Sequence, residues 1–173
     1  MPQGANPNLV FVLGGARSGK SAYAEARVAV HASPWVYVAT AQAFDEEMRA
    51  RIDAHRARRS ADWRNIEAPH ALAAAVREAT PNAPMLIDCL TLWLTNRLLA
   101  EADLAAERAE LVDALVARRA PTVVVSNEVG LGIVPDNALS RRFRDDAGLL
   151  HQAVARAAGE VHLIVAGLPI RAK

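Results

Sequence analysis

The sequence predicts one α/β domain with a doubly wound, mostly parallel sheet that carries helices on both faces. The chain of 173 residues suits a single compact domain. Its short apolar runs do not alternate with polar residues, which is typical of strands buried on both faces. Helix-favouring stretches separate these runs, and right-handed crossovers put such helices on both sides of a parallel sheet. Without a repeat or a linker-like composition break, we expect a disordered tail over 1–8 and a single domain over 9–173.

Each element of the first half has a local signal. Residues 9–13 form an apolar run that ends in two glycines, which predicts a buried strand. Residues 19–31 favour helix, and Pro34 just beyond them fits a helix end. Residues 35–39 are rich in β-branched and aromatic types and predict a second strand. The other elements expected here are a polar, helix-favouring stretch at 44–59, a short extended piece at 63–67 and a helix at 69–79.

The second half continues the alternation of strands and helices. The run Met-Leu-Ile-Asp at 85–88 predicts a buried strand, and the apolar runs at 122–126 and 161–165 predict two more. Helical segments are expected near 90–100, 104–119 and 139–158.

Composition and charge exclude several classes of function. Twenty Lys and Arg residues balance nineteen Asp and Glu residues, so no global positive field favours nucleic acid or an anionic membrane. Only 5% of the residues are aromatic, too few for a stacking platform for single-stranded nucleic acid. No apolar run approaches the ~18 residues of a membrane span, and the first residues do not resemble a secretion signal. The single cysteine, Cys89, cannot form an internal disulfide, so a cytoplasmic location is expected.

The segment after the first expected strand fits the phosphate-binding pattern G-x-x-x-x-G-K-[ST]. It consists of Gly14, Gly15, Ala16, Arg17, Ser18, Gly19, Lys20 and Ser21. Its place between a strand and a helix lets backbone N–H groups and the helix N-terminus face phosphate oxygens. Lys20 is then expected to reach the β- and γ-phosphates, and the Ser21 hydroxyl to bind Mg²⁺. The alternative is a glycine-rich turn without a ligand.

Asp88 ends an apolar strand, as a Walker B carboxylate does. In that role it holds Mg²⁺ directly or through water. The alternative is an N-cap of the helix expected over 90–100.

A histidine lies among arginines in the 44–59 stretch. Arg51 precedes His55 by four positions, and Arg58 and Arg59 follow it by three and four, so on a helix all three lie beside it. Such guanidinium groups suit a phosphate pocket, and their charge favours the neutral imidazole that a nucleophile needs. Equally, His55 falls on one stripe with apolar residues, and it can be a packed core histidine.

Two large classes of phosphate-loop protein lack their signatures here. A regulatory GTPase needs an N-K-x-D motif, and a transporter-type ATPase needs L-S-G-G-Q; neither occurs in the sequence. Asp145-Asp146-Ala147-Gly148 has the spacing D-x-x-G but falls within an expected helix. A small-molecule kinase or a nucleotidyl transferase remains.

Several further motifs, together with the phosphate loop, resemble the CobU/CobP family of bifunctional adenosylcobinamide kinase and adenosylcobinamide-phosphate guanylyltransferase enzymes. The resemblance covers nearly the whole chain. The motifs are Tyr37-Val38-Ala39-Thr40-Ala41-Gln42, Glu47-Met48, Arg51-Ile52, His55-Arg56, Asp88-Cys89-Leu90-Thr91, Asn127-Glu128-Val129-Gly130-Leu131-Gly132-Ile133-Val134-Pro135, Arg142-Phe143-Arg144-Asp145 and Ala166-Gly167-Leu168-Pro169-Ile170.

The resemblance implies a P-loop NTPase-like fold and two reactions of cobalamin biosynthesis. The first phosphorylates adenosylcobinamide with ATP or GTP. The second transfers GMP from GTP through a GMP–histidine intermediate to adenosylcobinamide phosphate, which gives adenosylcobinamide-GDP. By the family pattern His55 is the nucleophile, Mg²⁺ is the cofactor and the enzyme is a homo-oligomer, a trimer among relatives.

The resemblance also implies further nucleotide contacts, each with an ordinary structural alternative. Ala39, Thr40 and Ala41 are expected to contact the nucleotide but can be a plain strand end. The same holds for Arg56, Ala57, Arg58 and Arg59, which can be a solvated helix end, and for Glu67, which can be a surface carboxylate. Asp88, the matching Walker B acid, is implied as a nucleotide contact as well as a metal ligand.

Some positions depart from the family pattern. Ser60 stands where relatives often carry proline, Asn65 where they often carry threonine, and His151-Gln152 where they carry Asn-Gln. The loop 127–135 leaves the carboxyl end of a strand, where ligands bind in parallel sheets, and is expected either in the cobinamide or nucleotide pocket or in an inert turn. Two rival functions stay open, a P-loop kinase for another small molecule and a nucleotide-binding module without catalysis.

Overall fold

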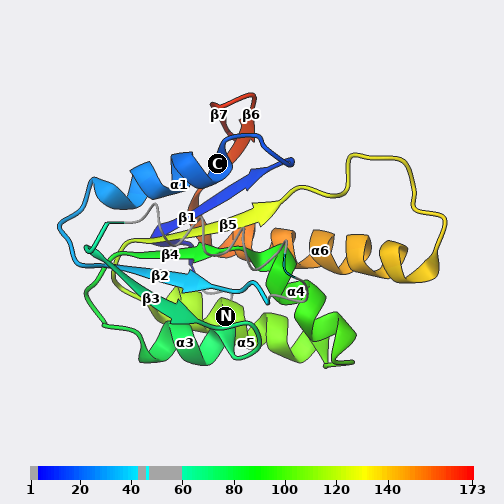
Figure 1. Ribbon diagram of the computed structural model, residues 1–173, viewed down its shortest axis with the longest axis horizontal. Coiled ribbons are helices and arrows are strands. Elements are labelled where there is room, and N and C mark those ends of the chain that lie inside the picture. The colour runs from blue at the N-terminus through cyan, green and yellow to red at the C-terminus, as the bar shows by residue number, and fades with distance from the viewer. Residues whose placement is uncertain (1–3, 43–45, 47–59) are drawn as a thin grey trace.

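Seven strands form one sheet in the computed structural model, which describes residues 4–42, 46 and 60–173 (Figure 1). The strands are β1 (Asn6–Gly14), β2 (Trp35–Ala39), β3 (Trp63–Glu67), β4 (Met85–Asp88), β5 (Thr122–Asn127), β6 (Ala158–Val165) and β7 (Leu168–Arg171). Their spatial order is β3-β2-β4-β5-β1-β6-β7. Every neighbouring pair is parallel except β6 and β7, which confirms the expected mostly parallel sheet.

Helices cover both faces of this sheet, as expected for a doubly wound α/β domain (Figure 1). The helix α1 (Lys20–Ala29) lies on one face. The other face carries α3 (Leu72–Glu78), α4 (Leu90–Leu99), α5 (Leu104–Ala117) and α6 (Ala138–Ala157).

The alternation of side chains along β1 divides the core into two layers. Val10 and Val12 pack toward α1, whereas Leu9 and Phe11 pack into the larger core beneath the other helices. Each of these side chains is almost completely buried. The sheet is therefore fixed on both sides, and the loops at its carboxyl edge rest on a rigid base.

The expected disordered tail over 1–8 is wrong for residues 6–8, which begin β1. Asn6 is buried, and its Nδ2 donates to the carbonyls of Leu115 at 3.0 Å and Arg118 at 2.9 Å. These bonds tie the start of β1 to the end of α5. A polar residue is held here by partners more than a hundred positions away, so local polarity gave no sign of a strand.

Other element boundaries differ from the expectation by up to three residues, and β7 was not foreseen. The helix expected over 139–158 occupies 138–157, so the Asp145-Asp146-Ala147-Gly148 segment is helical. The helix-favouring stretch 44–59 lies outside the described residues apart from Glu46. Among the described residues, no helix is long and apolar enough to cross a membrane.

Candidate active site

The phosphate loop connects β1 to α1 and needs a glycine at position 19 for two reasons. Gly19 caps α1 with a φ of 94°, in the left-handed region that side chains disfavour. A Cβ at Gly19 would also lie 3.1 Å from Cα of Gly167, in the turn between β6 and β7. The N–H of Gly167 donates to the carbonyl of Ser18 at 2.8 Å. The turn before β7 thus supports the phosphate loop, a contact that the sequence analysis missed although it had noted the Ala166-Gly167 motif.

Lys20 and Ser18 make this loop chemically unusual. Lys20 is only 9% exposed, and its Nζ donates to the carbonyl of Gly15 at 3.0 Å. This hydrogen bond places the ammonium group inside the loop. The hydroxyl of Ser18 is buried and has no hydrogen-bond partner in the described part of the chain. Buried polar groups are rarely left unpaired, so this hydroxyl is suited to a ligand oxygen or an ordered water. An ammonium group, an unpaired hydroxyl and a helix N-terminus together favour a bound anion.

Asp88 lies at the end of β4 and is held by a phenol. Tyr37 Oη donates to Asp88 Oδ2 at 2.9 Å. The alternative role of Asp88 as a helix N-cap is wrong, because the N-cap of α4 is Cys89 and no side chain caps that end. The carboxylate of Asp88 therefore accepts no capping hydrogen bond from the N-terminus of α4.

Thr40, expected among the nucleotide contacts, is completely buried and forms two hydrogen bonds with the backbone of Cys89. Its hydroxyl accepts from the Cys89 N–H at 2.9 Å and donates to the Cys89 carbonyl at 2.7 Å. Burial raises the pKa of the Cys89 thiol, and the neighbouring Asp88 carboxylate raises it further. The thiol is therefore neutral and unsuited to nucleophilic attack.

Two asparagines bind these loops together: Asn96, which sequence reasoning did not single out, and Asn127, which begins the motif at 127–135. Asn96 of α4 is buried, and its Nδ2 donates to the carbonyls of Thr40 and Pro69, both at 2.9 Å. Asn127, at the end of β5, donates from Nδ2 to Thr91 Oγ1 at 2.9 Å. The one available signal was a buried-helix asparagine in the apolar segment 90–99, since buried amides need partners.

The register of the strands aligns several predicted site residues along the carboxyl edge. Ala39 at the end of β2 lies opposite Asp88 on one side and Glu67 on the other, and Thr40 and Ala41 follow directly. Gly14, where the phosphate loop begins, lies opposite Asn127 on β5. Since four strand spacings separate β1 from β3, the phosphate loop and Glu67 are roughly 19 Å apart across the sheet. The structure thus gathers these residues on one edge but not at one point.

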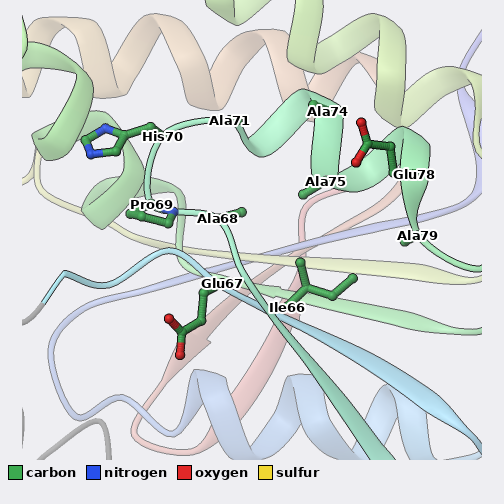
Figure 2. A pocket seen from close by; sticks show the side chains of 10 residues that line it. All are labelled: Ile66, Glu67, Ala68, Pro69, His70, Ala71, Ala74, Ala75, Glu78 and Ala79. Carbon is green, nitrogen blue, oxygen red and sulfur yellow. The ribbon is translucent and has the colours of Figure 1, made fainter.

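Glu67 borders a hollow between the end of β3 and α3 (Figure 2). The cavity has a volume of about 540 Å³, and its lining includes His70, Ala71, Ala74 and Glu78. In Figure 2 the Glu67 carboxylate points away from α3. His70 and Gln42 are in contact through their nitrogens at 3.2 Å, so the segment after β2 reaches the rim of this hollow.

The predicted nucleophile and its neighbours fall outside the described residues. These are His55, Arg56, Ala57, Arg58 and Arg59. Their roles therefore remain predictions from the sequence.

The donors near the phosphate loop fit Mg²⁺ in type. Ser21 brings a hydroxyl and Asp88 a carboxylate, the hard oxygen ligands that Mg²⁺ takes together with substrate phosphates and water. Among the described residues, no three His, Cys, Asp or Glu side chains form a dedicated metal cage.

Comparison with known proteins gives close relatives over the full domain. The chain is 52% identical to a bifunctional adenosylcobalamin biosynthesis protein CobP of Pseudomonas aeruginosa, across 94% of this chain and 96% of the relative. It is 42% identical to CobU of Salmonella typhimurium and 39% identical to CobU of Escherichia coli, each across 95% of this chain and 99% of the relative.

A solved structure from Pyrococcus horikoshii OT3 supports the fold alone, with a TM-score of 0.55 at 9% identity over 98% of this chain and 87% of that one. The family model described as cobinamide kinase / cobinamide phosphate guanyltransferase matches residues 10–172. Because this match spans nearly the whole chain, the protein belongs to the CobU family.

Proposed function

We propose that this protein phosphorylates adenosylcobinamide with ATP or GTP and then transfers GMP to the product, giving adenosylcobinamide-GDP in cobalamin biosynthesis. Family membership supports the two activities. The single structural observation that carries the proposal is the phosphate loop, where a nearly buried Lys20 and an unpaired Ser18 hydroxyl lie beside the N-terminus of α1.

In the kinase step the loop neutralises and orients the triphosphate. Backbone N–H groups of Gly15 to Gly19 face the phosphates, and Lys20 leaves the Gly15 carbonyl to contact the β- and γ-phosphates. The hydroxyl oxygen of the cobinamide side chain bonds to the γ-phosphorus and its proton passes to water, while the bond from that phosphorus to the bridging oxygen breaks and the nucleoside diphosphate leaves in line with the bond electrons. Positioning and charge neutralisation supply most of the catalysis in such a transfer.

Ser21 and Asp88 are the residues we assign to Mg²⁺. Bound Mg²⁺ supplies charge neutralisation between phosphate oxygens. Tyr37 donates to Asp88 Oδ2, so Oδ1 would be the oxygen that holds the ion or its water.

In the guanylyl step His55 is the proposed nucleophile. A neutral imidazole nitrogen attacks the α-phosphorus of GTP, the bond from that phosphorus to the bridging oxygen breaks, and pyrophosphate leaves with the bond electrons. A phosphate oxygen of adenosylcobinamide phosphate then attacks the same phosphorus and restores the histidine. The nucleotide contacts that we propose for this step come from the match to the family pattern. They are Ala39, Thr40, Ala41, Arg56, Ala57, Arg58, Arg59 and Glu67.

We also propose a homo-oligomer, a trimer as among relatives, that acts in the cytoplasm. The trimer rests on resemblance to the family. The compartment rests on the single cysteine, which is buried and reduced.

Two variants test the proposal at separate steps. Lys20→Ala is expected to lose phosphorylation of adenosylcobinamide, measured as transfer of label from ATP carrying radioactive γ-phosphate. His55→Ala is expected to keep that transfer but lose the acid-labile label from GTP carrying radioactive α-phosphate. Full kinase activity of Lys20→Ala, or a label that persists in His55→Ala, contradicts the assigned roles. A protein that phosphorylates cobinamide and never takes the α-label would be a kinase alone.

A further inference from the structure

A group of highly exposed apolar side chains lies in the loop between β5 and α6. Leu131 is 84% exposed, Ile133 is 98% exposed and Val134 is 62% exposed. Figure 1 shows this loop leaving the arrowhead of β5 and extending beyond the carboxyl edge of the sheet before the chain returns into α6. Neighbouring large apolar side chains exposed to this degree indicate a binding surface.

The backbone of this loop is held by its own polar groups. The Glu128 carboxylate accepts from the N–H groups of Gly130 at 2.7 Å and Leu131 at 3.1 Å. At the far end, Arg141 Nη1 donates to the carbonyls of Pro135 at 2.9 Å and Asp136 at 2.7 Å. Both ends of the loop are thus held by side chains of this chain, which limits the ordering that its apolar surface needs on binding.

The loop also begins beside the start of the phosphate loop. The N–H of Glu128 donates to the carbonyl of Gly14 at 3.0 Å, and Asn127 lies opposite Gly14 in the sheet. Leu131, Ile133 and Val134 follow a few residues later, so their surface extends from the same edge of the sheet as the phosphate loop, where the acceptor hydroxyl must meet the γ-phosphate. The segment 129–135 carries no charged residue, which suits an uncharged face of a ligand and not the triphosphate.

We propose that Leu131, Ile133 and Val134 form the docking surface for the corrin ring of the acceptor. This inference rests on the proposed function, because that function defines the acceptor as a large corrinoid with broad apolar ring faces. The exposed side chains of the phosphate loop are those of Ala16 and Arg17, so the loop offers that ring no large apolar residue. An apolar surface that begins beside the loop holds the ring while its side-chain hydroxyl, and later its phosphate, enters the reaction site.

The test compares Ile133→Ser and the double variant Leu131→Ser/Ile133→Ser with the unchanged enzyme. Loss of one buried apolar contact is expected to raise the KM for adenosylcobinamide about tenfold, with a larger rise in the double variant and little change in kcat. Self-labelling by GTP carrying radioactive α-phosphate requires no corrinoid and is expected to stay unchanged. Release of that label by adenosylcobinamide phosphate is expected to need a higher corrinoid concentration.

Val30→Ser is the matched control. Val30 is 76% exposed and follows the last turn of α1, at the opposite edge of the sheet from the phosphate loop. It is expected to leave every rate unchanged. If the unchanged enzyme does not phosphorylate adenosylcobinamide, the proposed function itself fails.

If the unchanged enzyme is active and the loop variants keep its KM, the docking surface is wrong. A second copy of this chain is the competing occupant. Analytical ultracentrifugation distinguishes it, because loop variants that change the oligomeric state would assign the surface to a subunit interface and overturn the proposal.

Discussion

Replacing Asn96 by alanine tests how the carboxyl edge of the sheet is held together. The side-chain amide joins the carbonyl after β2, at Thr40, to the carbonyl of Pro69 before α3. Alanine removes both hydrogen bonds and leaves the carbonyl oxygens of Thr40 and Pro69 without this donor. Each such loss costs about 1–3 kcal/mol, so we expect the free energy of unfolding to fall by about 2–6 kcal/mol.

Urea unfolding followed by circular dichroism measures this change. Leu99→Ala on the same helix is the matched control, because Leu99 is 59% exposed, and its free energy of unfolding is expected to stay within about 0.5 kcal/mol of the unchanged protein. Weaker GTP binding should accompany Asn96→Ala, since Thr40 is a proposed nucleotide contact. An Asn96→Ala protein as stable as the control, at an unchanged denaturant slope, would refute the bridging role.

Three further predictions follow from the site and its surroundings. Tyr37→Phe removes the hydroxyl that donates to Asp88 and should raise the Mg²⁺ concentration needed for half-maximal kinase rate. The melting temperature checks that the variant is folded. An unchanged Mg²⁺ requirement contradicts the positioning role. Gly19→Ala should lower the free energy of unfolding by about 1 kcal/mol or more, because the residue has a positive φ and a Cβ would crowd Gly167, and nucleotide binding by calorimetry should weaken with it. Burial lowers the pKa of His151, which bonds Ser126, to about 4 from an ordinary value of 6.5. The unfolded chain then binds this proton first, so stability should fall by up to about 3 kcal/mol as the pH drops from 6.5 to 4, and the fall should be smaller in His151→Asn.

The parts of the fold that follow local patterns were predictable from the sequence. The apolar runs that became β4 and β5, and the glycine-rich segment between β1 and α1, depend on neighbouring residues. The start of β1 was missed because Asn6 is buried by bonds to residues at the end of α5. β7 was missed because all four of its residues are exposed, so no burial pattern marks it.

In the site, too, features encoded by neighbouring residues were predictable, and contacts between distant residues were not. The phosphate loop and the end of β4 were identified from motifs. The hydrogen bond from Tyr37 to Asp88 and the two hydrogen bonds between Thr40 and Cys89 depend on which strands lie side by side. Strand order is a property of the folded chain, and no local signal in the sequence specifies it.

A pulse and chase with labelled GTP tests the central claim most directly. The purified protein is incubated with GTP carrying radioactive α-phosphate, freed of nucleotide, and then given adenosylcobinamide phosphate. We predict that the protein takes up one acid-labile label per active site and that the corrinoid removes it as adenosylcobinamide-GDP. A protein that never takes up label, or holds label that the corrinoid cannot remove, would contradict guanylyl transfer through this chain.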